Sequence, residues 1–299
     1  LMFIYQIRVE YLGTNFVGWQ IQKNGLSVQG VLEKVLSKYL KDKIRVIGSG
    51  RTDAGVHVRV NGGTVRISSE LWKSITPRKF IRAVDDLLPH DIAFLDVREV
   101  GFDWNPRIAL HRVYRYRLEG IEFWKDPGEV LSEWLSLFEG TYNATNFARL
   151  EPGKNPIRTI LSCKPWIVEG RTVGFEIVGE AFLWNQVRRT AMALHRLSIG
   201  EIAPEEVKRA IDHPEIECDF GVAPPDWLIL WGVDWDLMPL PNRSDEKRRV
   251  LTAPPSGPAV ERTMRKRWRQ GARHELKNLL YQEWAELGEL PIVKHRTVN

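Results

Sequence analysis

The sequence predicts an α+β protein made of two similar β-α-β-β-α-type halves, with mostly antiparallel sheets that helices flank. Three observations carry this prediction. Segments in which apolar and polar residues alternate are interleaved with segments whose apolar residues recur every three or four positions, as in strands and amphipathic helices. A similar order of segments begins again after residue 105, and the composition changes at residue 239. The chain is therefore expected to have three parts, 1–105, 106–238 and 239–299.

The first half is predicted from alternation, capping and helical spacing. Apolar and polar residues alternate at the start of the chain, which indicates a strand, and Ser27 is suited to cap the helix that follows it. Pro77 is suited to open a second helix. The predicted elements are, in order, a strand over 3–11, a helix over 28–39, strands over 44–47 and 63–67, a helix over 77–88 and a strand over 92–97.

A second half of similar order follows a pause in the pattern at 103–107. Its first strand has the sequence RVYRYRL over 112–118, and its last is the apolar run over 228–235. Between them the spacing predicts, in order, a helix over 130–138, strands over 160–168 and 173–179, and helices over 187–197 and 205–211. Each half would form a sheet covered on one side by helices, with a central cleft where the halves meet.

The tail beyond residue 239 has a different character. Proline and serine cluster over 239–258, which is typical of a linker. Apolar residues then recur mostly at multiples of four up to Leu287, which predicts one or two helices with Gly271 as a weak point. Arginine and lysine crowd the first half of this segment. Such a charge run is either a solvated helix face or a basic arm that contacts RNA, and both interpretations stay open.

The composition is that of an ordinary globular protein, with 43% hydrophobic and 27% charged residues among 299. The 43 basic and 38 acidic residues leave a formal net charge of +5, which permits a polyanionic partner without demonstrating one. Cys163 and Cys218 have neither metal-ligand spacing nor a disulfide framework. The sequence has no apolar run near 18 residues and no signal-peptide pattern, so we expect a cytoplasmic protein without a membrane segment.

Residues 50–57, with the sequence GRTDAGVH, are the strongest lead to chemistry. Two glycines bracket Asp53, and because glycine accepts tight turns and close backbone approaches, the carboxylate is suited to presentation in a cleft. A carboxylate can serve as a nucleophile, a general base or a metal ligand. The other interpretation is an aspartate that bonds local amides and stabilises a turn. The spacing of the octet leaves both open.

Two later segments combine cations with aromatic or apolar side chains. On the first strand of the second half, alternation sends Arg112, Tyr114 and Tyr116 to one face. There a ring can stack on a base while a guanidinium meets a phosphate, although an exposed antiparallel sheet would look the same. Residues 182–189 begin a helix, and an arginine from it placed near Asp53 would orient the carboxylate.

Together these segments resemble the TruA family of tRNA pseudouridine synthases over about residues 3–236. The octet is preceded, as in that family, by GWQ at 18–20 and SVQG at 27–30. The later segments that resemble family motifs are RVY at 112–114, PIRTI at 156–160, the arginine helix at 182–188, and AP at 223–224 with the closing strand at 228–233. Any one short motif could match by chance, whereas this many in the family's order form a strong signal.

The chain also departs from the family's pattern. Residues 102–109 carry one extra position, so no role is assigned to Arg107. Trp184 and Asn185 stand where the family commonly has tyrosine and histidine or another polar residue, and Ala193 lies near the place of a usual glycine. The tail beyond 239 matches nothing in the family core. These departures bear on RNA contacts and target choice rather than on the chemistry.

The resemblance implies isomerisation of uridine to pseudouridine in tRNA, typically in the anticodon stem-loop, with no cofactor and no metal. It implies that Asp53 is the essential carboxylate, that Arg188 pairs with it, and that Tyr114 stacks on the flipped uracil and handles a proton. Further residues expected to contact substrate or RNA are Arg51, Thr52, Arg112, Arg158 and Asn185. The partners implied are tRNA and a second copy of the chain in a homodimer.

Neighbours of the catalytic residues are expected to be structural. His57 is expected to make a hydrogen bond beside the octet rather than to act as an acid or base, and Trp19 and Gln20 to support the octet.

Two other classes of function remain in view. A non-catalytic RNA-binding or tRNA-folding protein could keep the cleft, but it would have no need of Asp53, Tyr114 and Arg188 together. A carboxylate-dependent hydrolase would want a metal or a pair of carboxylates, and the adjacent pair Asp85 and Asp86 falls on a predicted helix. Insensitivity to EDTA and an unchanged substrate mass would separate an isomerase from both kinds of hydrolase.

Overall fold

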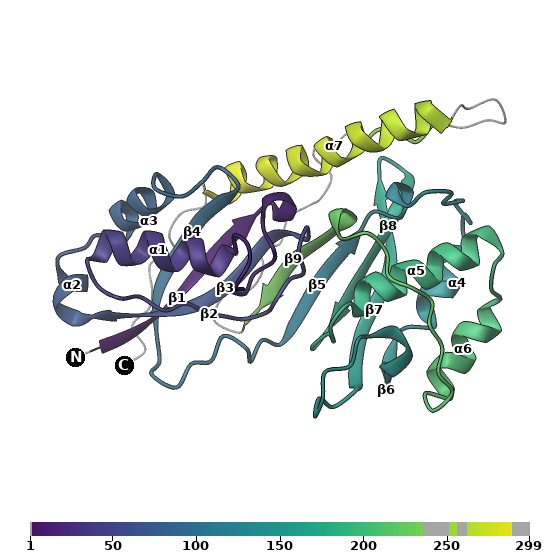
Figure 1. Ribbon diagram of the computed structural model, residues 1–299, viewed down its shortest axis with the longest axis horizontal. Coiled ribbons are helices and arrows are strands. Elements are labelled where there is room, and N and C mark those ends of the chain that lie inside the picture. Colours follow the sequence, from purple (N-terminus) through teal and green to yellow (C-terminus); the bar gives the residue numbers. More distant parts are fainter. Residues whose placement is uncertain (1, 236–250, 256–261, 289–299) are drawn as a thin grey trace.

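A computed structural model describes residues 2–235, 251–255 and 262–288 of the chain (Figure 1). Its strands form one nine-stranded sheet in the order β4-β1-β3-β9-β5-β8-β7-β6, with β2 pairing beside β3. The strands are β1 (Met2–Tyr11), β2 (Ile47–Gly48), β3 (His57–Ser68), β4 (Ile92–Val100), β5 (His111–Tyr116), β6 (Gly140–Asn143), β7 (Ile157–Val168), β8 (Arg171–Gly179) and β9 (Leu228–Asp234). All pairings are antiparallel except that of β3 with β9, so the predicted α+β class is confirmed.

All the helices but the last flank the sheet in two groups, one over each half, and the last extends along both halves (Figure 1). They are α1 (Val28–Leu40), α2 (Ser69–Lys73), α3 (Pro77–Asp85), α4 (Val130–Ser136), α5 (Gln186–Ile199), α6 (Pro204–Asp212) and α7 (Arg262–Gly288). Short 3-10 turns join them, namely η1 (Gly13–Asn15), η2 (Leu118–Gly120), η3 (Thr145–Phe147) and η4 (Pro225–Trp227). The expected cap is in place, because the Ser27 hydroxyl accepts from the Gly30 amide at 3.2 Å.

The two halves share this sheet, whereas the sequence predicted a separate sheet for each. The last strand of the second half, β9, lies between β3 and β5 and pairs in parallel with β3, His57 opposite Ile229 and Val58 opposite Leu230. In this place β9 supplies hydrogen-bond partners to β3 and β5, each of which would otherwise be an edge. The octet at 50–57 therefore ends where the halves meet.

The strand predicted over 44–47 is reduced to Ile47 and Gly48. Side chains of α1 occupy the backbone donors before it: Ser37 Oγ accepts from the Ile44 amide at 2.9 Å, and Glu33 Oε1 accepts from the Val46 amide at 3.0 Å. The apolar pattern correctly indicated burial, since Ile44 and Val46 are buried, but helix side chains replace a neighbouring strand.

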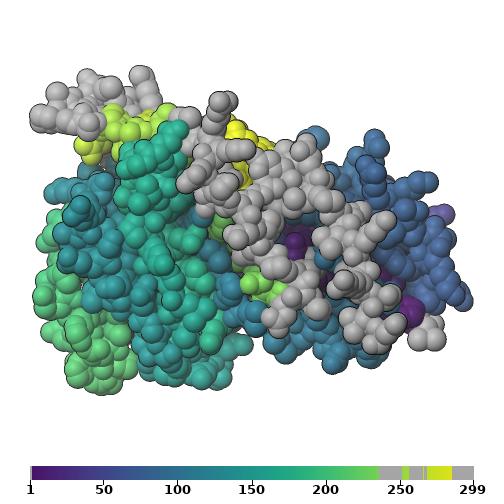
Figure 2. All heavy atoms as spheres, turned by 180° about the vertical axis from the view of Figure 1, so that it is seen from behind, coloured from purple at the N-terminus to yellow at the C-terminus, as the bar shows by residue number. Residues whose placement is uncertain are grey.

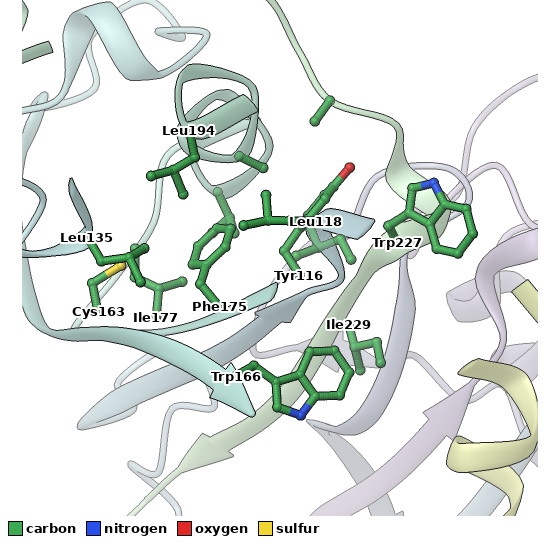
Figure 3. Close-up of a cluster of buried hydrophobic side chains, with 14 of the residues drawn as sticks. Tyr116, Leu118, Leu135, Cys163, Trp166, Phe175, Ile177, Leu194, Trp227 and Ile229 are labelled. Carbon is green, nitrogen blue, oxygen red and sulfur yellow. The ribbon is translucent and has the colours of Figure 1, made fainter. Parts of the chain in front are cut away.

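Two apolar cores lie against the sheet, one in each half, and Figure 3 shows side chains of the second. Seen from behind, the atoms of the two halves lie on opposite sides of the molecule (Figure 2). The first is built around Phe80 and β1, β3 and β4, and the second includes Phe175, Leu194 and Trp227. Tyr114 on β5 packs against both cores. This tyrosine therefore lies at the junction of the halves, as the end of the octet does.

Candidate active site

The octet forms a loop between β2 and β3 that neighbouring residues hold in place. The Tyr11 and Thr52 hydroxyls lie 2.7 Å apart, and the Trp19 amide donates to the Thr52 carbonyl at 3.2 Å. Gly18, at φ +113°, packs so closely that a Cβ there would lie 2.6 Å from that carbonyl, so only glycine fits. Thr52 is thus a buried support of the loop, and Trp19 supports it as expected, while Gln20 is exposed.

Asp53 and Arg188 form an ion pair across the junction. Arg188 Nη1 donates to Asp53 Oδ2 at 2.9 Å, and the two side chains are 16% and 26% exposed, so the pair is shielded but reachable. Arg188 is held from two further sides, because Nη1 also donates to Asn185 Oδ1 at 3.0 Å and Nε donates to the Ala223 carbonyl at 2.7 Å. The pairing expected from the sequence is present, and the guanidinium has one orientation available to it.

Asn185 orients this arginine. It precedes α5 with a left-handed backbone, φ 62°, which asparagine tolerates better than most residues. Its side chain accepts from Arg188 three positions later, one turn along the helix. The structure therefore assigns to Asn185 a contact with Arg188, while the RNA contact predicted for it stays a prediction.

Tyr114 lies opposite Leu230 of β9, so β9 alone separates it from Val58 at the start of β3. Its ring packs edge-on against Phe182 with centroids 5.0 Å apart. Burial raises the pKa of Tyr114 to about 12; the nearby Asp53 carboxylate also raises it, and Arg112 lowers it. The phenol is therefore protonated near neutral pH and can donate a proton. Tyr116 on the same strand is fully buried and belongs to the core, so the aromatic face offered to a base is smaller than alternation predicted.

The other arginines predicted to contact RNA differ in their exposure and in their partners. Arg112 donates to the carbonyls of Arg107, Glu180 and Ser49, and so it ties together three chain segments. Arg51 is exposed, with its Nη1 3.6 Å from Glu151 Oε1.

Arg158 is the second residue of β7 and donates to the carbonyls of its neighbours Asn155 and Ile157. Within the described part of the chain, the structure does not bring it into contact with the Asp53–Arg188 pair.

Sequence reasoning missed one surface feature beside the site. Trp184 is 42% exposed, and the Arg149 guanidinium lies 4.2 Å from its ring centroid. The Arg149 amide also donates to the Trp184 carbonyl at 2.8 Å, and Trp184 directly precedes Asn185. An arginine and an exposed ring together suit a nucleic-acid base and its phosphate. The signal in the sequence was the tryptophan at a position where the TruA pattern commonly has tyrosine.

His57 is a structural residue of the loop. It is 1% exposed, and its Nδ1 accepts from the Gly13 amide at 3.1 Å. Burial lowers the pKa of His57 from 6.5 to about 4, and Lys277 of α7 lowers it further, while Asp226 and Asp91 oppose the shift. The imidazole is therefore neutral near pH 7 and serves as a hydrogen-bond acceptor.

This depressed pKa predicts a loss of stability in mild acid. Between pH 6.5 and about 4 the unfolded chain binds a proton at residue 57 that the folded chain does not, so the free energy of unfolding falls as the pH falls. For this one group the loss between pH 7 and pH 5 is about 2 kcal/mol. Urea unfolding of the wild type and of His57→Asn at both pH values measures it. The variant should lose less stability than the wild type, and equal losses would contradict the assignment.

Among residues 2–235, 251–255 and 262–288, no three or more His, Cys, Asp or Glu side chains gather in a way that could hold a metal ion. No helix in the same part of the chain has the length and apolar content needed to cross a bilayer. The neighbouring carboxylates of the hydrolase alternative, Asp85 and Asp86, lie at the end of α3, where Asp85 accepts from the Phe94 amide at 2.8 Å.

Comparison with known proteins agrees with this geometry. The profile of a family described as tRNA pseudouridine synthase matches residues 7–107 and 135–236, which is more than half of the chain. The chain belongs to this tRNA pseudouridine synthase family. The resemblance to TruA is thereby confirmed. The octet and the arginine helix fall within the matched residues, whereas β5, which carries Tyr114, lies between the two matched segments.

Individual tRNA pseudouridine synthases support the same conclusion. The tRNA pseudouridine synthase A of Exiguobacterium sibiricum is 33% identical over 243 residues, covering 77% of this chain and 95% of that protein. The proteins of the same name from Rhizobium meliloti and Listeria monocytogenes are 31% and 32% identical to this chain. The aligned residues cover 77% and 78% of this chain and 99% of each of those proteins. Members of this family are isomerases. The profile ends at residue 236, so α7 lies outside the part of the chain that it matches.

Proposed function

We propose that this protein isomerises uridine to pseudouridine in tRNA, within the anticodon stem-loop, with Asp53 as the essential carboxylate. Family membership supports the reaction class, and the names of the relatives support tRNA as the substrate. The observation that carries the proposal is the Asp53–Arg188 ion pair of 2.9 Å at the junction of the halves, beside Tyr114.

The reaction breaks the bond between C1′ of the ribose and N1 of uracil, turns the base over, and joins C1′ to C5. C5 loses its proton in that last step and N1 gains one, so the composition of the nucleotide is unchanged. No group enters or leaves and no electrons are transferred to another molecule, so the chemistry requires no cofactor. Asp53 begins it either by attacking C1′ or by removing the proton from C2′, and each role uses the ionised carboxylate. Arg188 holds that carboxylate toward the substrate, which reduces the reorientation needed in the transition state.

Binding has to offset the cost of taking the uridine out of its stack, which is a few kcal/mol. Arg51 is suited to contact phosphate or to fill the place of the extruded base, because its guanidinium is exposed at the loop that carries Asp53. Trp184 with Arg149 offers a ring and a cation beside the same site. Arg112 on β5 and Arg158 on β7 are further candidates for phosphate contacts.

Tyr114 is expected to stack on the uracil and to handle a proton late in the reaction. Tyr114→Phe should therefore lower the single-turnover rate about 100-fold while tRNA affinity stays within about twofold, since the ring remains and only the phenol is lost. Tyr114→Ala should weaken binding as well, because stacking contributes about 1–3 kcal/mol per base. Rates are measured by tritium release from C5-labelled tRNA and affinities by filter binding. A Tyr114→Phe enzyme with full turnover would exclude the proton role and leave the stacking role.

The function is tested by incubating the protein with an unmodified tRNA transcript and mapping pseudouridine by carbodiimide labelling. Signals at uridines of the anticodon stem-loop, an unchanged RNA mass and activity in EDTA are expected. Signals elsewhere in the tRNA would correct the target, and cleaved RNA or released uracil would indicate a hydrolase. Tight binding without modification would favour the second candidate, a non-catalytic RNA-binding or tRNA-folding protein.

The homodimer is part of the same proposal and rests on the family resemblance. Light scattering of the purified protein is expected to give twice the mass of one chain. A cytoplasmic location remains a prediction.

A further inference from the structure

Helix α7 lies outside the family-matched residues and extends along both halves of the protein (Figure 1). It contacts β3 and β4 in the first half and the turns η2 and η4 in the second. Ala272, Leu276, Leu280 and Trp284 recur every four residues and are all buried. This face of the helix therefore docks on the core as part of the folded protein.

Buried charges fix where the helix docks. Glu283 Oε2 lies 2.6 Å from Arg59 Nε on β3, and both side chains are buried. At the other end, the fully buried Arg117 pairs with Glu275 at 3.0 Å and donates to the Ala272 carbonyl at 3.2 Å. Because a buried charge that loses its partner is strongly unfavourable, these pairs define one position for α7.

Arg273 connects α7 to residues 223–227, which include the turn η4. Its Nε donates to Asp226 Oδ2, and its guanidinium carbon lies 4.9 Å from the ring centroid of Trp227. Trp227 is fully buried at the edge of the second core (Figure 3). Arg269, one turn earlier on the same helix, instead pairs with Glu122 at 3.1 Å. The two arginines therefore make the same kind of contact to two different segments.

Residues 223–227 also touch the catalytic pair from the other side. The Ala223 carbonyl accepts from Arg188 Nε at 2.7 Å, and the Ala223 amide donates to the Arg188 carbonyl at 3.1 Å. Pro225 lies against Gly55 of the octet, where a Cβ would be 3.1 Å from its Cγ. One short segment thus contacts both the arginine and the loop that carries Asp53.

We propose that Arg273 of α7 is a positioning residue for the catalytic centre, because its ion pair with Asp226 holds residues 223–227 where they orient Arg188 against Asp53. The proposal rests on the proposed function. It makes a helix outside the family-matched part of the chain necessary for the geometry of the site. It also gives the basic run at the start of α7 a role that is distinct from the solvated face and the RNA arm considered for the sequence.

The test compares Arg273→Ala with Arg269→Ala in the full chain. Each variant removes one arginine from one helix together with one ion pair, and the ion pair of Arg269 is with Glu122 rather than with Asp226. Arg273→Ala should slow pseudouridine formation at saturating tRNA by roughly 10- to 100-fold with tRNA affinity within about twofold, as expected for a misplaced catalytic group. Arg273→Lys should recover part of the rate. Arg269→Ala should keep the wild-type rate.

Two further measurements separate positioning from general destabilisation. Hydrogen exchange at the Ala223 amide, which is bonded to Arg188, should accelerate in Arg273→Ala and stay unchanged in Arg269→Ala. Asp226→Asn removes the same ion pair by changing its acidic partner, so its rate loss should match that of Arg273→Ala. The double variant should be no slower than either single variant.

Three results would overturn the proposal. Weaker tRNA binding at an unchanged saturated rate would make Arg273 an RNA contact. Equal rate losses in both alanine variants would indicate a purely structural helix. A wild-type rate in Arg273→Ala would remove the positioning role while leaving the proposed function intact. Failure of the proposed function is distinguishable, because it appears as absence of pseudouridine with the wild-type protein itself.

Discussion

Asp53→Ala is expected to abolish pseudouridine formation, lowering the single-turnover rate by about 10⁴-fold or more. In either first step considered above, the bond-making or proton-accepting atom is a carboxylate oxygen, and alanine supplies none. Asp53→Asn should be nearly as inactive, because an amide of the same shape is a poor nucleophile and a poor base. Rapid-quench measurement on labelled tRNA gives these rates.

The fold should survive the Asp53 substitutions. The Asp53 backbone carbonyl accepts from the Val56 amide at 3.2 Å, and this contact does not need the side chain. Arg188 keeps its contacts with Asn185 and Ala223. Asp86→Asn, a surface aspartate at the end of α3, is the matched control and should retain the wild-type rate. An Asp53→Ala protein that kept a tenth of the wild-type rate would refute the proposed role.

Arg188→Ala is expected to lower turnover about 100-fold while tRNA affinity changes less than about threefold. The reason is geometric: Arg188 touches Asp53 at 2.9 Å and is itself held by Asn185 and Ala223, so its loss frees the carboxylate to rotate. Arg188→Lys should recover only part of the rate, because an ammonium cannot reproduce the fork that reaches these separate acceptors.

The neighbouring Arg189 is the matched control for Arg188. It belongs to the same helix turn but pairs with Asp219, which is 69% exposed, at 2.7 Å. Arg189→Ala should therefore leave the rate and the affinity within about twofold, since exposed ion pairs contribute little. Equal loss of turnover and tRNA binding in Arg188→Ala would assign Arg188 to substrate binding instead. Filter binding and single-turnover rates on the same samples separate the two.

Local periodicity predicted most elements because each depends on neighbours in the chain. Helices α1, α3, α5 and α6 and strands β1, β4 and β8 lie where alternation, capping and helical spacing placed them. The short strand β6 and helix α2 were missed, since four or five residues carry too little pattern. Pairing between strands is a different kind of information. That β9 inserts between β3 and β5 depends on which edge is free, and no local pattern encodes it.

The tail illustrates the same division. Its spacing predicted one or two helices, and the structure has a single helix, α7, that continues through Gly271, the position expected to be weak. Packing against the core explains the continuity, because the flanking residues Trp268 and Ala272 contact it and outweigh the cost of one glycine. The charge run could not be assigned from sequence, since the partners Glu122 and Asp226 lie far away along the chain. The linker predicted over 239–258 falls mainly outside the described residues.

The sequence by itself determined the family and predicted which residues carry the chemistry. The order of the motifs from the octet to the arginine helix identified the family and singled out Asp53, Tyr114 and Arg188 as the candidate catalytic residues. Only the tertiary structure decided their arrangement: Asp53 and Arg188 are 135 positions apart and meet at 2.9 Å. They meet where β3 pairs in parallel with β9, and the Ala223 carbonyl holds Arg188 there. Motifs follow from local chemistry, whereas distances across a sheet follow from packing that every part of the chain shares.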